Sequence, residues 1–468
     1  MKTTRLDLPV MASWMESNGR RLDCNPYLSG GFEARVLLER LNAEKQPLKE
    51  VTQGGMKGIF NGPRFSRQYV NDPKHGVPFL GSTDILAADL SGLSMISKKQ
   101  VKAHPELLID EGWTLITCSG TIGRMVFSRA DMKGMTGSQH FMRIIADRTK
   151  IPPGYLYAYL SSRFGVSLIT SGTYGSIIQH LEPNHIADLP VPRLGDAIEN
   201  EVHQLIVKAS HLRSIASDSL QKAKSEFDWL LQDIPRRKLN RSEPLVNTVS
   251  SGLVQKRFDA NYHNPNATQL ENIISSKTHT TIGALCQRVL LPGIFKRIHT
   301  DEIEYGAPYY SGASLYWLEP IPKALLSRKT SLFKDVQLEA GTILIQAFGQ
   351  ADGLVARPTW VGRHLHKATT THMLVRLNLI DPEIAGYLYA YIDSIAGYTQ
   401  ISRLPYGGSI PHFDEKGISS ILVPLLPKED ILRISNMVLN AFEERDEALD
   451  LELQARKLVE NKISCPEV

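Results

Sequence analysis

The sequence is poor in cysteine. Its 468 residues include four cysteines, Cys24, Cys118, Cys286 and Cys465, which lie far apart and form no CxxC pair. This spacing argues against zinc ribbons, thiol redox motifs and a disulfide framework. We therefore expect ordinary reduced thiols.

Long hydrophobic runs are absent as well. No apolar stretch approaches the ~20 residues that a helix needs to span a bilayer. Near the start, Asp7, Pro9 and Glu16 interrupt the stretch where a secretory signal would be continuously apolar. The sequence predicts a cytoplasmic protein without a membrane partner.

The short motifs of common catalytic sites are also missing. There is no P-loop, HExxH or GxSxG string, and no Asn-Pro-Pro-aromatic or Asp-Pro-Pro-aromatic motif of the kind that amino-methyltransferases use. The nearest strings, Asn25-Pro26-Tyr27 and Asn264-Pro265-Asn266, lack the second proline. His364, His366 and His372 lie close in sequence and could suggest a metal site. The first half of the chain, which resembles the second, has no Cys, Asp or Glu ligands that match them. We expect no catalytic residues, no cofactor and no metal site.

The composition is that of a globular protein. Hydrophobic residues make up 42% and charged residues 22% of the chain, which is enough for packed cores. The length predicts two or three domains. The net charge of +4 and the isoelectric point near 8.7 permit nucleic-acid binding without establishing it.

The chain contains an internal repeat. The hexapeptide Gly-Tyr-Leu-Tyr-Ala-Tyr occurs at Gly154–Tyr159 and again, 232 residues further on, at Gly386–Tyr391. Shorter matches flank it at nearly the same offset, which predicts a tandem duplication. These matches pair Arg21, Asp23 and Asn25 with Arg257, Asp259 and Asn261, Gly58–Phe60 with Gly293–Phe295, Gly76 and Pro78 with Gly306 and Pro308, His140 with His372, Ser176-Ile177 with Ser409-Ile410, and Val191-Pro192 with Val423-Pro424.

Each copy reads as α+β. Short apolar runs separated by Gly, Pro and Asn predict strands and turns, and each hexapeptide should open a short helix. The predicted strands are Trp113–Cys118, Met125–Ser128 and Phe141–Ile145 in the first copy, and Thr342–Ile345, Leu354–Ala356 and His372–Arg376 in the second.

A long helical pattern follows each Val-Pro pair. From Asp196 to Leu231 apolar residues recur in steps of four and three with one extra step of four, which indicates a heptad seam with a stutter. The second copy repeats the pattern from Lys428 to Ile463, and each helix should be roughly 50 Å long. The predicted seam residues are Ile198, Val202, Leu205, Ala209, Leu212, Ala216, Leu220, Ala223, Phe227 and Leu230 in the first helix, and Ile431, Ile434, Val438, Phe442, Leu449 and Leu453 in the second.

Each seam must be buried, either against its own domain or against the other helix. The chain order of domain, helix, domain, helix, with a basic linker near Arg236 to Arg241, favours an antiparallel helix pair. Such a pair would relate the halves by a pseudo-twofold axis. The predicted segments are a first domain at 1–194, a spacer helix at 195–235, a second domain at 236–426 and a second spacer helix at 427–468.

In its order of motifs the chain resembles the specificity (S) subunits of type I restriction-modification systems. The features that carry the resemblance are the strand-turn-strand Gly112–Arg124, the Tyr-Gly-Ser-Ile segment Tyr174–Ile177, the Leu-Pro-Val-Pro string Leu189–Pro192, and the long helix that follows. This order occurs twice and spans essentially the whole chain. In the second copy the turn departs from the pattern, with Phe348–Gly353 in place of Ser-Gly-Thr-Ile-Gly-Arg.

The resemblance implies a DNA-reading subunit that is not itself an enzyme. It implies an α+β tandem repeat of two target-recognition domains separated by two long antiparallel coiled-coil helices. It also implies a bipartite, asymmetric double-stranded DNA target with an unspecified spacer. The implied protein partners are two methyltransferase (M) subunits, which would bind the helical spacer and its flanks, and translocating restriction (R) subunits.

Two alternatives to this interpretation belong to other classes: a DNA methyltransferase or nuclease that acts on its own, and a scaffold that binds only proteins. Phosphate contacts should come from Lys and Arg, and base contacts from Arg, Asn, Gln, Ser and Thr. The repeated tyrosines suggest base stacking, but burial in a domain core is the better interpretation, because two different half-sites would not require identical strings. The candidate DNA-binding residues are Lys57, Arg64, Arg67, Arg124, Tyr174 and Ser176 in the first copy, and Lys296, Arg297, Gln346, Gln350, Tyr406 and Ser409 in the second.

Overall fold

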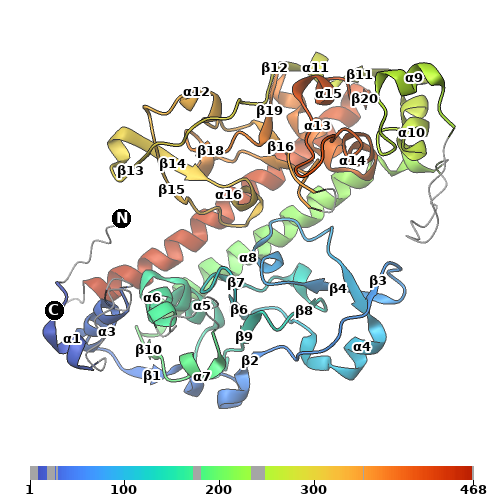
Figure 1. Ribbon diagram of the computed structural model, residues 1–468. Coiled ribbons are helices and arrows are strands. Elements are labelled where there is room, and N and C mark those ends of the chain that lie inside the picture. The colour runs from blue at the N-terminus through green and yellow to red at the C-terminus, as the bar shows by residue number, and fades with distance from the viewer. Residues whose placement is uncertain are drawn as a thin grey trace. The chain divides into compact units, whose positions relative to one another are not determined.

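The computed structural model describes residues 9–17, 27, 30–171, 181–232, 234, 248–350 and 353–465, and it is a mixed helix-and-sheet structure, as expected (Figure 1). The chain divides into two compact units. Unit 1 comprises Met1–Ser214 and Glu447–Val468, and unit 2 comprises Ile215–Asp446. The two longest helices, α8 (Asp196–Ser225) and α16 (Lys428–Ser464), contribute residues to both units.

Unit 1 contains two four-stranded sheets and one strand pair. The first sheet has the order β2-β9-β6-β7 and is antiparallel throughout, while the second has the order β3-β5-β4-β8 and ends in a parallel pair. The strands are β1 (Lys45–Pro47), β2 (Ile59–Asn61), β3 (Tyr69–Val70), β4 (Gly76–Leu80), β5 (Met95–Ser97), β6 (Thr114–Thr117), β7 (Met125–Phe127), β8 (Thr136–Gly137), β9 (Phe141–Ile144) and β10 (Pro190–Pro192), the last of which pairs with β1.

Helices cover the core of unit 1. Besides α8, they are α1 (Ala12–Ser17), α3 (Gly31–Arg40), α4 (Lys98–Ala103), α5 (Pro153–Ser161), α6 (Arg163–Ser171) and α7 (Pro183–Ile186). Tyr155 of α5 and Leu168 of α6 share one hydrophobic core with Ile116 of the first sheet and with Val202 of α8. The helices therefore hold that sheet against the long helix.

Unit 2 has the same strand order. Its sheets run β12-β19-β16-β17 and β13-β15-β14-β18, with a separate β11-β20 pair. The strands are β11 (His279–Thr281), β12 (Cys286–Leu290), β13 (His299–Thr300), β14 (Gly306–Tyr310), β15 (Ala324–Ser327), β16 (Ile343–Gln346), β17 (Pro358–Trp360), β18 (Thr369–Thr370), β19 (Leu374–Leu379) and β20 (Leu422–Pro424). Besides α16, the helices are α9 (Ser251–Lys256), α10 (Pro265–Ser275), α11 (Ile282–Leu285), α12 (Phe333–Val336), α13 (Ala385–Asp393), α14 (Ile395–Ile401) and α15 (Glu415–Ser419).

Most of the predicted strands are present, but Leu354–Ala356 is wrong. This segment forms a turn, in which Arg357 N donates to Leu354 O at 3.0 Å and Ala356 has a φ of 66°. A residue in that left-handed region cannot continue a strand. The strand begins two residues later, as β17. The predicted strand His372–Arg376 likewise begins later, at Leu374, as β19.

Two of the sequence matches are out of register. Phe60 lies in β2 opposite Arg143, whereas Phe295 follows the end of β12. His140 O accepts from Cys118 N, and in unit 2 the equivalent acceptor is Met373 O rather than a group of His372. Leu290, and not Phe295, lies opposite Arg376, so the first match is displaced by several residues and the second by one. A short matching string does not by itself show which residues hold equivalent places in a strand.

The repeated hexapeptide forms the start of α5 and α13, as predicted, and its tyrosines are buried. The hydroxyl of Tyr155 donates to Pro192 O, and that of Tyr387 donates to Pro424 O at 2.7 Å. The tyrosines therefore attach each short helix to the strand that leads into a long helix. Their burial agrees with the interpretation that the tyrosines belong to a domain core, and not with base stacking.

The long helices occur nearly as predicted, with lengths of about 45 and 56 Å at 1.5 Å per residue. The predicted seam is partly wrong. On α8 the buried stripe passes through Ile206 and Arg213 instead of Leu205 and Leu212, and it needs no stutter. The stripe is Val202, Ile206, Ala209, Arg213, Ala216, Leu220, Ala223 and Phe227, in regular steps of four and three.

The seam of α16 needs a similar correction, because Leu453 is 42% exposed and its neighbour Glu452 is buried. Arg213 and Glu452 read as polar in a sequence pattern, so the predicted seams pass through their neighbours Leu212 and Leu453 instead. The other predicted seam residues of α16 that the buried set contains are Ile434, Val438, Phe442 and Leu449. The buried stripe of α16 is Ile434, Val438, Ala441, Ala448, Glu452, Ala455, Val459 and Ile463.

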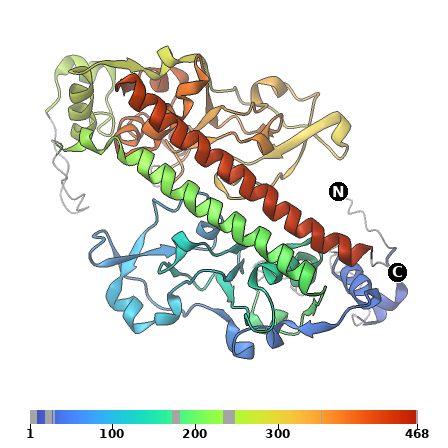
Figure 2. The same ribbon diagram turned by 180° about the vertical axis from the view of Figure 1, so that it is seen from behind.

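Within each unit, parts of both long helices share a core; in Figure 2 α8 is green and α16 is red. In unit 1, Val202 and Ile206 of α8 lie in one core with Ala455 and Val459 of α16. In unit 2, the core contains the C-terminal half of α8, from Ala216 on, and the N-terminal half of α16. The seams are thus buried against the other helix as well as against the neighbouring domain.

Candidate nucleic-acid interface

A row of aromatic rings connects four loops of unit 2. Phe295 and His372 have ring centroids 6.2 Å apart, and Phe348 lies 5.8 Å from His372. Phe348 stacks on His412 at 4.8 Å and 4°, and His412 lies 5.0 Å from Tyr406. We call these five residues the unit-2 aromatic row. It brings the loop after β12, the loop before β19, the turn after β16 and the 406–412 segment to one place.

Predicted residues attach to both ends of this row. Arg297 lies over the Phe295 ring at 5.7 Å and donates through Nε to the Tyr309 hydroxyl at 2.7 Å. Its neighbour Lys296 is exposed. At the other end, Gln350 Nε2 donates to Ser409 O at 3.2 Å. Both of these loops are exposed, so their polar groups can reach a ligand.

Gln346 lies beneath the row. Its Nε2 donates to Phe348 O at 2.8 Å, and its buried Oε1 has no hydrogen-bond partner among the described residues. Burial, together with the nearby Arg297 and Arg376, lowers the pKa of His372, so its ring is neutral at neutral pH. The structure thus brings all six predicted residues of the second copy together around one row.

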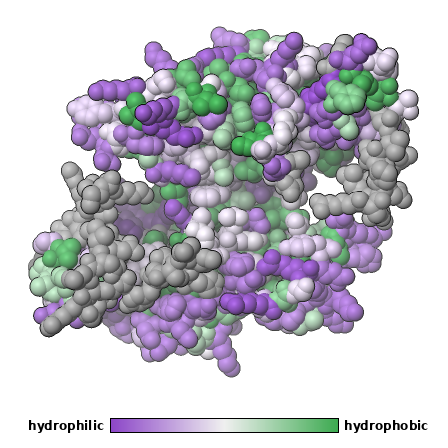
Figure 3. Space-filling view, in the orientation of Figure 1, coloured by the Kyte–Doolittle hydropathy of each residue, from purple (hydrophilic) through white to green (hydrophobic). Residues whose placement is uncertain are grey.

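A hollow of about 810 Å³ adjoins this row, lined among others by Arg257, Phe258, Gln350, Tyr406 and Asp414. Arg257 is held by Asp259 at 2.6 Å and lies over the Tyr406 ring at 5.4 Å. Phe258 is 92% exposed, and hydrophobic side chains gather at the α9–α10 end of this unit (Figure 3). Aromatic and cationic groups with exposed edges are suited to bases and phosphates.

Unit 1 carries a polar row in the corresponding place. Arg67 donates to Gln139 Oε1 at 2.8 Å, and Gln139 Nε2 lies 3.1 Å from His140 Nε2. His140 Nδ1 lies 3.2 Å from the Ser119 hydroxyl. We call Arg67, Gln139, His140 and Ser119 the unit-1 polar row.

The unit-1 polar row leads to the turn that carries Arg124. This turn joins β6 to β7, and Arg124 N donates to Thr117 Oγ1 at 3.0 Å. Gly120 and Gly123 have φ values of 74° and 83°, which explains why this turn needs glycine. The structure therefore links Arg67 to the turn of Arg124 through Gln139, His140 and Ser119, none of which is among the predicted DNA contacts.

The remaining candidates of the first copy are placed differently. Arg64 is exposed in the loop between β2 and β3. Lys57 is exposed in the 3₁₀ helix Gly55–Gly58, at the end of β2 that is farther from Arg64. Tyr174 and Ser176 lie outside the described residues.

Two buried arginines, which the sequence interpretation missed, support the rows. Arg143 donates to Gly137 O at 2.9 Å and to Ser138 O at 3.3 Å. Arg376 donates to Leu374 O at 2.8 Å and to Thr371 O at 3.3 Å. Burial lowers the pKa of each to about 10. The sequence held a signal for these two residues, because each is a lone arginine in an apolar strand segment, at matching places in β9 and β19. Such a buried arginine needs backbone carbonyls as hydrogen-bond acceptors.

The three histidines considered as metal ligands have separate surroundings. His364 lies 3.3 Å from Asp446 O, His366 lies 3.3 Å from Glu339, and His372 belongs to the aromatic row. Within the described ranges no cluster of three potential metal ligands occurs. None of the helices that the structure describes combines the length and apolarity of a membrane span.

No family model and no curated protein matches the chain. Several solved structures resemble it, among them the following three. The type I restriction-modification S subunit from M. genitalium is 13% identical, with 92% of this chain and 97% of that chain covered and a TM-score of 0.37. The HsdS subunit from Thermoanaerobacter tengcongensis is 14% identical, with 92% and 96% covered and a TM-score of 0.27.

The third is a chain from a study of complex assembly and conformational transition of the type I restriction-modification system. It is 13% identical, with 92% and 100% covered and a TM-score of 0.26.

Proposed function

We propose that this chain is the DNA-specificity subunit of a type I restriction-modification complex. The observation that carries the proposal is the same strand order in both units, each with a row of polar or aromatic groups on its loops. Two similar readers on long helices suit a linear target with two separated recognition patches, and duplex DNA is such a target.

The proposed architecture is a tandem repeat with a pseudo-twofold axis and an antiparallel coiled coil of α8 and α16. The regular heptad spacing of the buried stripe of α8, which most of the α16 stripe follows, supports it. The target-recognition domains would be residues 1–194 and 236–426, and the spacer helices 195–235 and 427–468.

Each domain would read its own half-site, which gives a bipartite and asymmetric target. The two rows differ in chemistry: Arg67 and Gln139 offer hydrogen bonds in unit 1, whereas Phe348 and Tyr406 offer stacking faces in unit 2. Different chemistry at corresponding places supports different half-sites. The proposed contacts are Arg64, Arg67, Arg124, Tyr174 and Ser176, with Lys57 as a phosphate contact, in the first domain, and Lys296, Arg297, Gln346, Gln350, Tyr406 and Ser409 in the second.

The chain would work in the cytoplasm as a non-catalytic scaffold for two M subunits and for R subunits. Asn264 and Pro265, from one of the two strings nearest to a methyltransferase motif, instead begin a helix: Asn264 Oδ1 accepts from Asn266 N at 2.9 Å and caps α10. This local role argues against the alternative of a self-sufficient methyltransferase.

A domain exchange tests the proposal. Residues 1–190 are replaced by the equivalent domain of a related subunit, and the complex with its methyltransferase is used for base-resolution methylation mapping. We expect one half of the methylated sequence to change and the other to stay. A soluble complex in which both halves change would contradict modular reading, and methyl transfer from labelled S-adenosylmethionine by the purified chain alone would contradict the non-catalytic role.

A further inference from the structure

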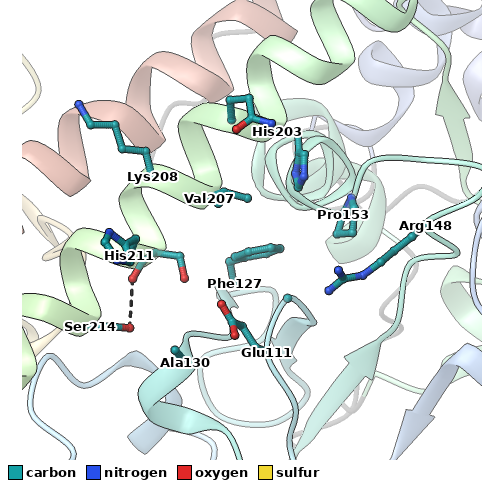
Figure 4. Close-up of a pocket in the computed structure, with 13 residues that line it drawn as sticks. Glu111, Phe127, Ala130, Arg148, Pro153, His203, Val207, Lys208, His211 and Ser214 are labelled. Carbon is teal, nitrogen blue, oxygen red and sulfur yellow. Dashed lines mark hydrogen bonds between the residues drawn. The ribbon is translucent and has the colours of Figure 1, made fainter.

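Unit 1 has an open pocket at the place where unit 2 is filled by its own side chains. The pocket measures about 590 Å³ and lies between α8 and the end of β7. Its lining includes Phe127, Ala130, Pro153, His203, Val207 and Ser210. In Figure 4, Val207 and His203 of α8 lie on one side of the Phe127 ring and Glu111 lies on the other.

In unit 2 an aromatic ring fills the corresponding space. Trp360, which ends β17 as Phe127 ends β7, stacks on Phe442 at 4.9 Å and 3°. Tyr389 meets the same Phe442 ring edge-on at 4.8 Å. Phe442 of α16 corresponds to Ser210 of α8, because both helices begin at the repeat offset. Unit 1 keeps the corresponding aromatic pair, Phe127 and Tyr157, whose ring centroids lie 5.5 Å apart, but it has Ser210 in place of the Phe442 ring.

The residues around the mouth of the pocket also differ between the two units. In unit 2, Arg363 pairs with Glu443 at 3.2 Å, and its backbone N donates to Asp446 at 2.8 Å, which closes the space from the side. The corresponding residues of unit 1 are Ala130, His211 and Ser214, which offer neither the guanidinium nor the carboxylates of the unit-2 pairs. Unit 1 therefore lacks the contacts that close this side in unit 2.

We infer that this pocket receives an aromatic side chain from the methyltransferase subunit, which would take the place that Phe442 takes in unit 2. The inference rests on the proposed function for the identity of the partner, but the aromatic chemistry comes from the comparison of the two units. Val207, Lys208 and His211 are exposed on the α8 side of the mouth, so an incoming protein surface can reach the pocket. The volume lies within the range typical of ligand sites, and aromatic anchors in such pockets dominate many interfaces.

The consequence is an asymmetric attachment of partners. Unit 1 would accept an aromatic anchor, while unit 2 presents a closed surface at the same place. Two copies of one methyltransferase would then bind the two halves through different contacts, with the anchor used only at unit 1.

A first experiment needs no partner. Indole and p-cresol, the side-chain analogues of Trp and Tyr, are used as probes in saturation-transfer NMR with the purified full chain. We expect transfer with the wild type and its loss in Ser210→Phe, which supplies the ring internally, and in Ala130→Arg, which copies the closed rim. Gln221→Phe, on an exposed part of α8 outside the pocket, should keep the transfer. Equal transfer in the wild type and in both pocket variants would overturn the aromatic pocket.

A second experiment uses the complex. Ser210→Phe and Ala130→Arg should each weaken methyltransferase binding by about 30-fold, the size typical of losing one aromatic anchor. A photocrosslinker at Val207 should capture a segment of the methyltransferase that contains an aromatic residue, and one at Leu439, its counterpart in unit 2, should not. A complex that forms without crosslinking at Val207 and tolerates both variants would overturn the assigned occupant. Failure of any methyltransferase to bind the wild type would instead count against the proposed function, while the probe experiment would still decide the pocket chemistry.

Discussion

Arg213 of α8 and Glu452 of α16 form a two-pronged ion pair inside the buried stripes of the long helices. Arg213 Nε donates to Glu452 Oε1 at 3.0 Å and Nη2 donates to Oε2 at 2.8 Å, and the side chains are only 3% and 10% exposed. At the repeat offset the same positions hold Arg445 and Leu220, so the carboxylate is specific to unit 1. A single polar pair within an apolar seam favours one helix register over others.

Breaking this pair should destabilise the protein strongly. Glu452→Leu leaves the Arg213 charge buried without its carboxylate, which costs about 3–5 kcal/mol in the free energy of unfolding. The double variant Arg213→Met/Glu452→Leu should recover most of the loss, because neither charge remains. Urea unfolding measures both. The exposed pair of Lys208 and Glu447 is the control, since Glu447→Ala should cost less than about 1 kcal/mol. If the double variant loses as much free energy of unfolding as the single variant does, packing and not charge determines the stability at this site.

The glycine that begins each hexapeptide should not tolerate a larger side chain. A Cβ on Gly386 would lie 2.2 Å from Ser435 O, whereas one on Gly154 would meet His203 Nδ1 at 2.7 Å and His203 O at 3.0 Å. We therefore expect Gly386→Ala to lower the melting temperature more than Gly154→Ala, because a backbone carbonyl cannot move as a ring can. Gly252→Ala in α9, where no atom lies within 4 Å, should be neutral or slightly stabilising. A Gly386→Ala protein with the wild-type melting temperature would refute the close helix contact.

His203 should make the stability depend on pH. Burial and the nearby Arg148 lower the pKa of His203, and its Nδ1 accepts a hydrogen bond from Gly154 N at 3.1 Å. Because the folded pKa lies below the unfolded value, the unfolded chain binds the proton more readily. The stabilisation is complete above about pH 6.5 and is lost as the pH falls below that value.

The measurement is the melting temperature between pH 7.5 and pH 5 for the wild type and for His203→Asn, whose amide oxygen can still accept the Gly154 hydrogen bond. The variant should lose less stability on acidification than the wild type does. Parallel curves for the two proteins would rule out His203 as a contributor.

The two rows should read different halves of the target. In the reconstituted complex, Arg67→Ala should weaken recognition of one half-site and Gln350→Ala that of the other, each by about 1–3 kcal/mol if the residue touches a base. Methylation mapping on a randomised target library measures the change at each position. Lys57→Ala is the comparison, because this exposed residue lies apart from the unit-1 polar row and a phosphate contact would weaken all sequences alike and lower the salt dependence. Loss of the same half-site in both row variants would contradict the proposed division.

The helices should set the spacing of the two half-sites. Seven-residue insertions into both helices, near Ala216 and Leu449, keep the regular heptads in phase and lengthen the pair by roughly 10 Å. The preferred spacer should then grow by about three base pairs. These base pairs also rotate the second half-site by about 100° around the duplex, which lowers activity. Methylation of a library with varied spacers reports the optimum. Full activity at an unchanged spacer would show that the helices do not measure DNA.

The structure agrees with the sequence where the signal is local. The helix at Gly154–Tyr159, the helix at Gly386–Tyr391 and the start of both long helices follow from spacing and from proline or turn residues within a few positions. The six candidates of the second copy are predicted from residue type and repeat position, and the loop after β12, strand β16, the turn after it and the 406–412 segment bring them to one row. Local patterns are reliable because neighbouring residues in the chain determine them.

Only the tertiary structure decided which face of α8 is buried. Arg213 becomes an interior residue because Glu452, 239 positions away, neutralises it, and no local pattern contains that partner. The same reason applies to the stacking of Phe348 on His412 and to the pocket beside Phe127, which is open because the distant Ser210 lacks the ring of Phe442. The sequence by itself determined two similar domains and two long helices, since periodicity and repetition are properties of the chain. Packing brings together residues that are distant in the chain. It therefore decides which side chains fill a space, which form pairs and where a pocket stays open.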